Sequence, residues 1–238
     1  MPPVCRLGLA TRGNSRLGPA DVEHAVERGI NYLNWCGRPD ALSQTVAALG
    51  RDRAKVVVAA QLDGRDFDSL LRDLGAEYLD IATLYYVESE AEWREILAPG
   101  GLLDSLQREK AAGRLRLIGL TSHQRRLAAS WLDSGHLDLL MVRYNAAHRG
   151  AERDVFPVAA SRGTPVVTFT ATRWGALRVP DCYRFCLANP AVSVTLAAPA
   201  TRRELDDTLG LLDDWRAPDL AALRAHGDRV RRVAGRFP

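Results

Sequence analysis

The chain has 238 residues, and its net charge of +3 comes from a nearly even mixture of 32 basic and 29 acidic residues. No basic block resembles a nucleic-acid footprint, and RVRR at 229–232 is typical of the exposed face of a closing helix. No apolar stretch approaches the roughly 18 residues of a membrane span. The four cysteines show no CxxC pair and no ligand spacing. We therefore expect no nucleic acid, membrane or metal partner, and a reduced, cytoplasmic chain.

Apolar segments of strand length alternate with amphipathic helical segments along the chain. The expected strands are 4–10, 30–36, 55–62, 78–87, 115–121, 137–144, 165–170 and 192–197. The expected helices are 19–28, a helix from the turn at 37–40 to about 49, 66–74, 91–112 with an interruption at 99–101, 125–132, a helix ending at 161, 180–188, 202–213 and 220–233.

Eight strand–helix units predict an α/β fold, the closed (β/α)8 barrel (TIM barrel), formed by residues 1–238 as one domain. An open doubly wound sheet is the alternative, but no G-x-G-x-x-G follows the first strand. A barrel places its chemistry at the carboxyl ends of its strands. We expect short loops there and a shallow, open mouth.

Six segments at or near the predicted strands form a recognisable series. They are GINYLNW (29–35), LGAEYLDIATLYY (74–86), GRLRLIGLTS (113–122), VRYNAAHRGAERDVFP (142–157), VVTFTATRWGAL (166–177) and PAVSVTLAAPATRRELDDTL (190–209). In this order they resemble motifs of the aldo-keto reductase family. Each motif alone is weak, but six in the right order indicate the fold and the ancestry over nearly the whole chain. The resemblance implies an oxidoreductase that uses NADP(H) on a small carbonyl compound or alcohol.

The catalytic residues that the resemblance implies are an Asp, a Tyr, a Lys and a His, and none is matched. Their positions hold Asn34, Pro39, Gln61 and Tyr85. Carbonyl reduction needs a proton donor of tuned pKa, and the uncharged Gln61 cannot lower the pKa of a neighbouring phenol. We therefore predict that conventional carbonyl reduction is absent or very slow.

The cofactor site implied by the resemblance is partly kept. The residues that would hold the nicotinamide carboxamide are Thr121, Ser122 and Met141, of which the two hydroxyls still form hydrogen bonds. Phe169 is suited to stack on the ring, with Thr170 beside it. At the phosphate site the family's Lys and Arg are replaced by Ala200 and Glu204, so Arg202 and Arg203 are the candidate replacements.

Two residues are candidates for catalysis. Tyr85 is the proton-transfer candidate if it, rather than Tyr86, points inward; the alternative is a packing tyrosine. Arg143 should also point inward, where a cation needs either an anionic ligand or a salt bridge to Glu152. His148 and Glu152 are expected to brace their loop.

The substrate-binding candidates lie at other strand ends. For His123, the alternative is a loop residue that contacts no ligand. For Trp35 and Trp174, the alternative is packing in the core. We expect one cavity to be lined by Asn34, Gln61, Tyr85, Thr121, Met141, Arg143 and Phe169. The substrate-binding candidates are Asn34, Trp35, Gln61, His123 and Trp174.

Two functions remain open from the sequence. One is the NADP(H)-linked oxidoreductase. The other is a non-redox protein on the same scaffold, either a cofactor-independent isomerase, cyclase or dehydratase or a ligand-binding pseudoenzyme. Both take a small-molecule ligand, and we expect a monomer or a homodimer.

Overall fold

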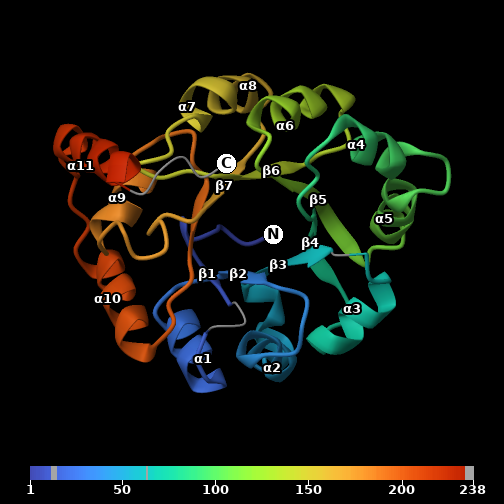
Figure 1. Ribbon diagram of the computed structural model, residues 1–238. Helices are drawn as coiled ribbons and strands as arrows, with labels where there is room; N and C mark the ends of the chain where they lie inside the picture. Colours follow the sequence, from blue (N-terminus) through green and yellow to red (C-terminus); the bar gives the residue numbers. More distant parts are fainter. Residues whose placement is uncertain (12–14, 63, 234–238) are drawn as a thin grey trace.

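The structure, a computed structural model, describes residues 1–11, 15–62 and 64–233. Its strands are all parallel, pair in chain order and close into a barrel where the last strand pairs with the first (Figure 1). This confirms the predicted (β/α)8 barrel and excludes the open sheet. The strands are β1 (Leu7–Ala10), β2 (Tyr32–Trp35), β3 (Val57–Leu62), β4 (Leu79–Leu84), β5 (Leu115–Ser122), β6 (Leu139–Arg143), β7 (Val166–Phe169) and β8 (Val194–Ala197).

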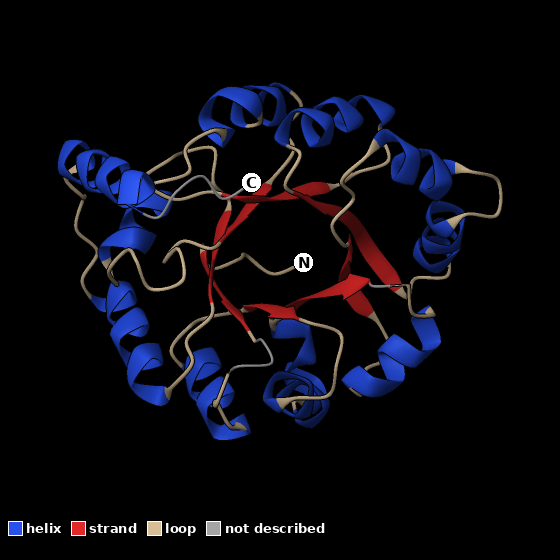
Figure 2. Cartoon of the chain, in the orientation of Figure 1, coloured by secondary structure: helices blue, strands red, loops and turns tan. Residues whose placement is uncertain are grey.

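Helices form a ring around the barrel (Figure 2). The predicted interruption at 99–101 separates α4 from α5, and Gly100 adopts a φ of +77° there. Two short 3-10 helices span Gly50–Lys55 and Leu132–Ser134. The α-helices are α1 (Pro19–Glu27), α2 (Ala41–Ala48), α3 (Phe67–Leu74), α4 (Glu90–Leu97), α5 (Leu102–Ala111), α6 (Arg125–Trp131), α7 (Ala151–Asp154), α8 (Phe156–Ser161), α9 (Asp181–Leu187), α10 (Arg202–Asp213) and α11 (Leu220–Val233).

Side-chain caps fix where several of these helices begin. Asp40 accepts a hydrogen bond from the backbone N–H of Ser43 at 3.0 Å and so starts α2. At α4, Ser89 accepts from the N–H of Glu92 at 3.2 Å, while the Glu92 carboxylate accepts from the N–H of Ser89 at 2.9 Å. This reciprocal pair is a capping box. It holds the loop between β4 and α4 in place beside the barrel mouth.

Except for β5, the strands are shorter than the apolar runs that predicted them. β1 begins at Leu7 rather than at residue 4, and Val4 instead packs, partly buried, against the inside of the barrel. β4 ends at Leu84, although the apolar run continues to Val87. Tyr86 adopts a left-handed φ of +50°, which turns the chain away from the sheet. The apolar runs therefore extend beyond the residues that pair in the sheet.

Side chains alternate between the inside of the barrel and the layer facing the helices. The inward residues form a compact group, called the interior cluster below. The outward residues belong to a second, larger core under the helices. The interior cluster consists of Ala10, Tyr32, Val57, Ala59, Ile81, Leu139, Met141, Val167, Phe169, Val194 and Leu196.

One carboxylate is fully buried in the layer outside the strands. Asp80, on β4, accepts from the backbone N–H of Val58 at 2.9 Å. It also pairs with Arg53 and Arg116, each at 2.8 Å, and both guanidinium groups lie over the ring of Tyr78. Because its charge is compensated on several sides, Asp80 joins β3, β4 and β5 rather than destabilising them.

Within the described residues, no helix combines the length and the apolar character required to cross a membrane.

Candidate functional site

A cleft of about 610 Å³ opens at the carboxyl ends of the strands. Its floor holds Asn34, Gln61, Met141 and Phe169, from four different strands. One wall is the loop after β7, and the cleft then continues to the first turns of α10. It is therefore elongated, with one end at the barrel mouth and the other at a helix N-terminus.

Two strand ends carry polar atoms that are buried but lack a partner among the described residues. Asn34 is 1 % exposed, and its Oδ1 has no hydrogen-bond partner among the described residues. The hydroxyl of Thr121, fully buried on β5 next to Met141, also lacks one. Buried polar groups are normally hydrogen-bonded, and Asn34 lines the cleft, so its Oδ1 is available to a ligand. Ser122 differs, because its hydroxyl accepts from the backbone N–H of Gln124 at 2.9 Å.

Of the seven residues expected to line one cavity, four lie on the cleft floor and three do not. Asn34, Gln61, Met141 and Phe169 are brought together as predicted. Thr121, Tyr85 and Arg143 are not among the lining residues, which corrects that expectation. Trp174 and Thr170, predicted separately, do line the cleft.

The inward tyrosine is Tyr86, which corrects the prediction for Tyr85. Tyr86 packs against the interior cluster, stacks on His123 with ring centroids 4.6 Å apart and meets Phe169 edge-on at 6.4 Å. Tyr85 is 39 % exposed and lies against Tyr86. Strand alternation ends with β4 at Leu84, so it does not extend to either tyrosine.

Trp35 also lies elsewhere than predicted. It is fully buried in the core under the helices, and its indole N–H donates to the carbonyl oxygen of Arg38 at 2.7 Å. Its neighbour Asn34 takes the inward position, and successive strand residues face opposite sides. Trp35 therefore packs in the scaffold, which was the alternative left open for it.

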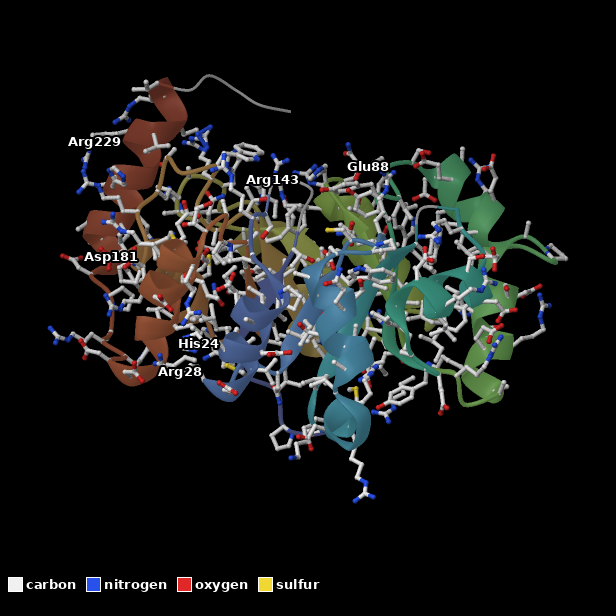
Figure 3. The ribbon with its side chains drawn as sticks, turned by 90° about the horizontal axis from the view of Figure 1, so that it is seen from below. His24, Arg28, Glu88, Arg143, Asp181 and Arg229 are labelled. Atoms are coloured by element: carbon white, nitrogen blue, oxygen red, sulfur yellow. The ribbon has the colours of Figure 1, made fainter. Side chains whose placement is uncertain are left out.

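Arg143 ends β6 at the rim, at the same end of the barrel as Glu88 (Figure 3). Its Nη2 lies 3.5 Å from Nε2 of His123, and its guanidinium lies 5.6 Å from the Trp174 ring. The backbone N–H of His123 donates to Glu88 at 2.7 Å. Burial and, secondarily, Arg143 lower the pKa of His123. At neutral pH this imidazole is therefore uncharged.

Glu152 braces the loop after β6, as expected. It accepts from the Tyr144 hydroxyl at 2.7 Å and pairs with Arg224 of α11 at 2.8 Å. The salt bridge considered between Glu152 and Arg143 is thus replaced by one to α11.

Arg173 is a buried cation that the sequence did not reveal. It lies in the loop after β7, is 2 % exposed, and its Nε and Nη2 have no partner among the described residues. Arg173 and Trp174 both adopt left-handed φ values, +47° and +54°. Such conformations in non-glycine residues cost about 1–3 kcal/mol each and gather at functional sites. No local pattern marks an arginine in a polar loop as buried.

His148 lies in the loop after β6. Its pKa is lowered to about 4, first by burial and then by the charges of Arg173, Arg143, Arg125 and Arg231. A histidine whose folded pKa is lowered takes up a proton on unfolding, so stability falls as pH drops from about 6.5 towards 4. The pKa of Asp154 is lowered to about 2, so this carboxylate contributes a further loss of folding stability only below about pH 4.

We expect His148→Gln to flatten this pH dependence. Urea unfolding of wild type between pH 7 and pH 4 should show a falling free energy of unfolding, and the variant should lose less over the same range. Equal slopes for the two proteins would show that His148 is not the titrating group.

Two carboxylates line the outer end of the cleft, and Arg178 is also among the lining residues of the cleft. Glu204 and Asp207 line it, whereas Arg202 and Arg203, the predicted phosphate ligands, do not. Arg202 is held by Asp21 at 3.2 Å and Asp206 at 3.0 Å. The Glu204 carboxylate accepts from the N–H of Ala200 at 2.8 Å and so already occupies part of the helix N-terminus.

Two further groups bear on the possible chemistry. In the part of the chain that the structure describes, no three His, Cys, Asp or Glu side chains are grouped to hold a metal ion. Cys182 and Cys186 are buried thiols, and burial raises the pKa of Cys182 to about 12. They remain protonated and unreactive at neutral pH.

Comparisons with known proteins identify the fold. No protein-family model and no curated protein matches the chain. An aldo-keto reductase, AKR11C1 from Bacillus halodurans in its holo form, matches with a TM-score of 0.74 and 19% identity, over 95% of this chain and 92% of its own. An aldo-keto reductase from Klebsiella pneumoniae in complex with NADPH matches with a TM-score of 0.75 and 18% identity, over 94% and 92%. The chain therefore shares the aldo-keto reductase fold, as its segments implied.

Proposed function

We propose that this protein is an NADP(H)-linked oxidoreductase of the aldo-keto reductase type, acting on a small carbonyl compound or alcohol. The observation that carries the proposal is the elongated cleft, which joins the barrel mouth at Phe169 to the start of α10. This shape suits an extended dinucleotide with its reactive ring at the mouth. The Klebsiella pneumoniae structure that shares the fold holds NADPH.

The residues at the mouth fit a nicotinamide ring. Phe169 offers an aromatic face, and the buried Oδ1 of Asn34 offers an unpartnered acceptor for an amide N–H. The outer end fits a 2′-phosphate less well, because Glu204 and Asp207 repel an anion. NADP(H), when bound, supplies or accepts the hydride.

The proton for the reduction would come from a residue at the rim of the barrel. It would not come from the positions that hold the catalytic residues of aldo-keto reductases. Pro39 is exposed in the loop after β2, and the uncharged Gln61 occupies the place implied for the lysine. Tyr86 carries a phenol at the mouth, and its oxygen is near enough to Arg143 to raise the pKa of that guanidinium, although burial lowers it more. We assign Tyr86 as the proton donor, with Arg143 stabilising negative charge on the substrate oxygen.

The non-redox alternative is favoured by one observation. Asn34 and Gln61 make the cleft floor neutral, and no lysine is among the described lining residues. A cofactor-independent isomerase, cyclase or dehydratase, or a ligand-binding pseudoenzyme, would use the same mouth without the outer half of the cleft. The two functions therefore differ in whether residues near α10 affect ligand binding.

Titration of the purified protein with NADPH and NADH, followed by cofactor fluorescence, tests the proposal. We expect both to bind. Glu204→Gln keeps the acceptor for the Ala200 N–H but removes the charge, so it should tighten NADPH binding about two- to fivefold and leave NADH nearly unchanged.

Asp213→Asn, an exposed change at the far end of α10 beside Arg28, is the matched control and should change neither affinity. Absence of binding for both cofactors would refute the oxidoreductase proposal and leave the non-redox alternative.

A further inference from the structure

A second cavity, of about 300 Å³, lies between the loop after β7 and two helices, α9 and α11. The two helices pack side by side at the edge of the helical ring (Figure 1). Leu177 and Arg178 line this cavity and also the cleft, so the two cavities adjoin at these residues. The other lining residues belong to this cavity alone, which is called the side pocket below.

The side pocket stays open because α11 is held in a fixed position. Gly227 of α11 packs so closely on the loop after β6 that a Cβ atom there would lie 2.2 Å from the carbonyl oxygen of Ala146. Arg224, one turn earlier on the helix, pairs with Glu152 at 2.8 Å. The helix therefore cannot move inwards to close the gap, and the small side chain of Ala222 leaves the gap unfilled.

The body of the side pocket is apolar. Leu177, Cys182 and Phe185 are buried and form its floor, and Leu223 of α11 lines the opposite wall. Ligand pockets of proteins start at about 300 Å³ and are lined mainly by hydrophobic and aromatic side chains. The side pocket therefore has the size and the lining for one ring or one branched chain, and it is too small for a nucleotide.

The rim of the side pocket carries an excess of positive charge. Arg178 and Arg229 both line it and are exposed, and neither belongs to an ion pair of the described residues. Asp181 is the one carboxylate among the described lining residues, and it already pairs with Arg184 at 3.3 Å. Arg229 and Asp181 lie along the same side of the molecule (Figure 3). An anion at this rim would therefore meet two uncompensated guanidinium groups.

We propose that the side pocket binds a small carboxylate with an apolar body, an aromatic or branched-chain acid. The apolar walls enclose the ring or chain, and Arg178 and Arg229 pair with the carboxylate at the rim. His226, also in the lining, offers a further hydrogen bond. This ligand is distinct from the substrate and the cofactor of the cleft, so the inference goes beyond the proposed function and does not depend on it.

The test is isothermal titration calorimetry of the cofactor-free protein with benzoate as the probe. Benzoate should bind with a Kd below about 1 mM, a moderate affinity for a ligand of its size. Benzamide keeps the ring without the charge, and acetate keeps the charge without the ring. Each should bind at least about tenfold more weakly than benzoate, because each loses one of the two kinds of contact.

Variants of residues that line the side pocket but not the cleft locate the bound probe. Arg229→Gln removes one charge from the rim and should weaken benzoate binding about tenfold. Ala222→Phe fills the pocket and should abolish benzoate binding. Arg232→Gln, the control, removes a charge from the same helix outside the pocket and should change the Kd less than about twofold. All three positions are exposed, so the variants should fold.

Two kinds of result would overturn the inference. One is wild-type protein that does not bind benzoate, or that binds benzamide or acetate as tightly as benzoate. The other is wild-type affinity for benzoate in Arg229→Gln or in Ala222→Phe, because the probe would then occupy another part of the protein, such as the cleft.

Discussion

Asp80→Ala should lower the free energy of unfolding by about 3–5 kcal/mol, the usual cost of removing one partner from a buried ion pair. The change leaves the side chain of Arg53, which is only 10 % exposed, without its carboxylate, and leaves the N–H of Val58 without its acceptor. Urea unfolding followed by circular dichroism measures the loss. The barrel should remain closed up to the unfolding transition, because the backbone pairing between the strands is unaffected.

Asp68→Ala is the matched control. Asp68 also pairs with an arginine, Arg114 at 2.6 Å, but its side chain is 65 % exposed. Exposed pairs contribute about 0–1 kcal/mol. If both variants lost the same stability, the buried network around Asp80 would not have the role that its burial implies.

Tyr86→Phe should reduce the rate of carbonyl reduction by about 10²- to 10⁴-fold, the usual contribution of a general acid. The ring contacts with His123 and Phe169 remain possible, so the affinity for NADPH should change little. Because wild-type turnover is itself expected to be slow, the measurement is made with enzyme in excess over aldehyde, following cofactor absorbance.

Tyr85→Phe provides the comparison within the same dipeptide. Tyr85 is exposed and lies outside the interior cluster, so the rate of carbonyl reduction by Tyr85→Phe should stay within about twofold of wild type. This change is far smaller than the loss of a general acid would cause. The reverse result, with Tyr85→Phe inactive and Tyr86→Phe active, would restore the assignment that strand alternation alone suggests.

The sequence predicted the barrel because hydrophobic periodicity and helix signals act locally. The strand and helix order needed no tertiary information, and the interruption at 99–101 was visible in Pro99, Gly100 and Gly101. Asn34 and Gln61 were placed correctly on the cleft floor because both lie within paired strands, where facing alternates strictly.

The rest of the site could not be predicted because it lies beyond the strand ends. Tyr86 reaches the mouth through a left-handed backbone conformation, which no alternation rule describes. The burial of Arg173, in the loop after β7, follows no local pattern either. Arg202 has a suitable charge for a phosphate, but Asp21, distant in sequence, pairs with it in the folded chain.

The central claim is that this mouth transfers hydride. The most direct test is to incubate the protein with a small aldehyde and NADPH deuterated at the transferable position of its nicotinamide, and to analyse the product by mass spectrometry. The account predicts that alcohol forms slowly and carries deuterium, and that Tyr86→Phe forms far less of it. Bound NADPH with no deuterated alcohol after prolonged incubation, or a product formed without cofactor, would contradict the account and assign the scaffold to non-redox chemistry.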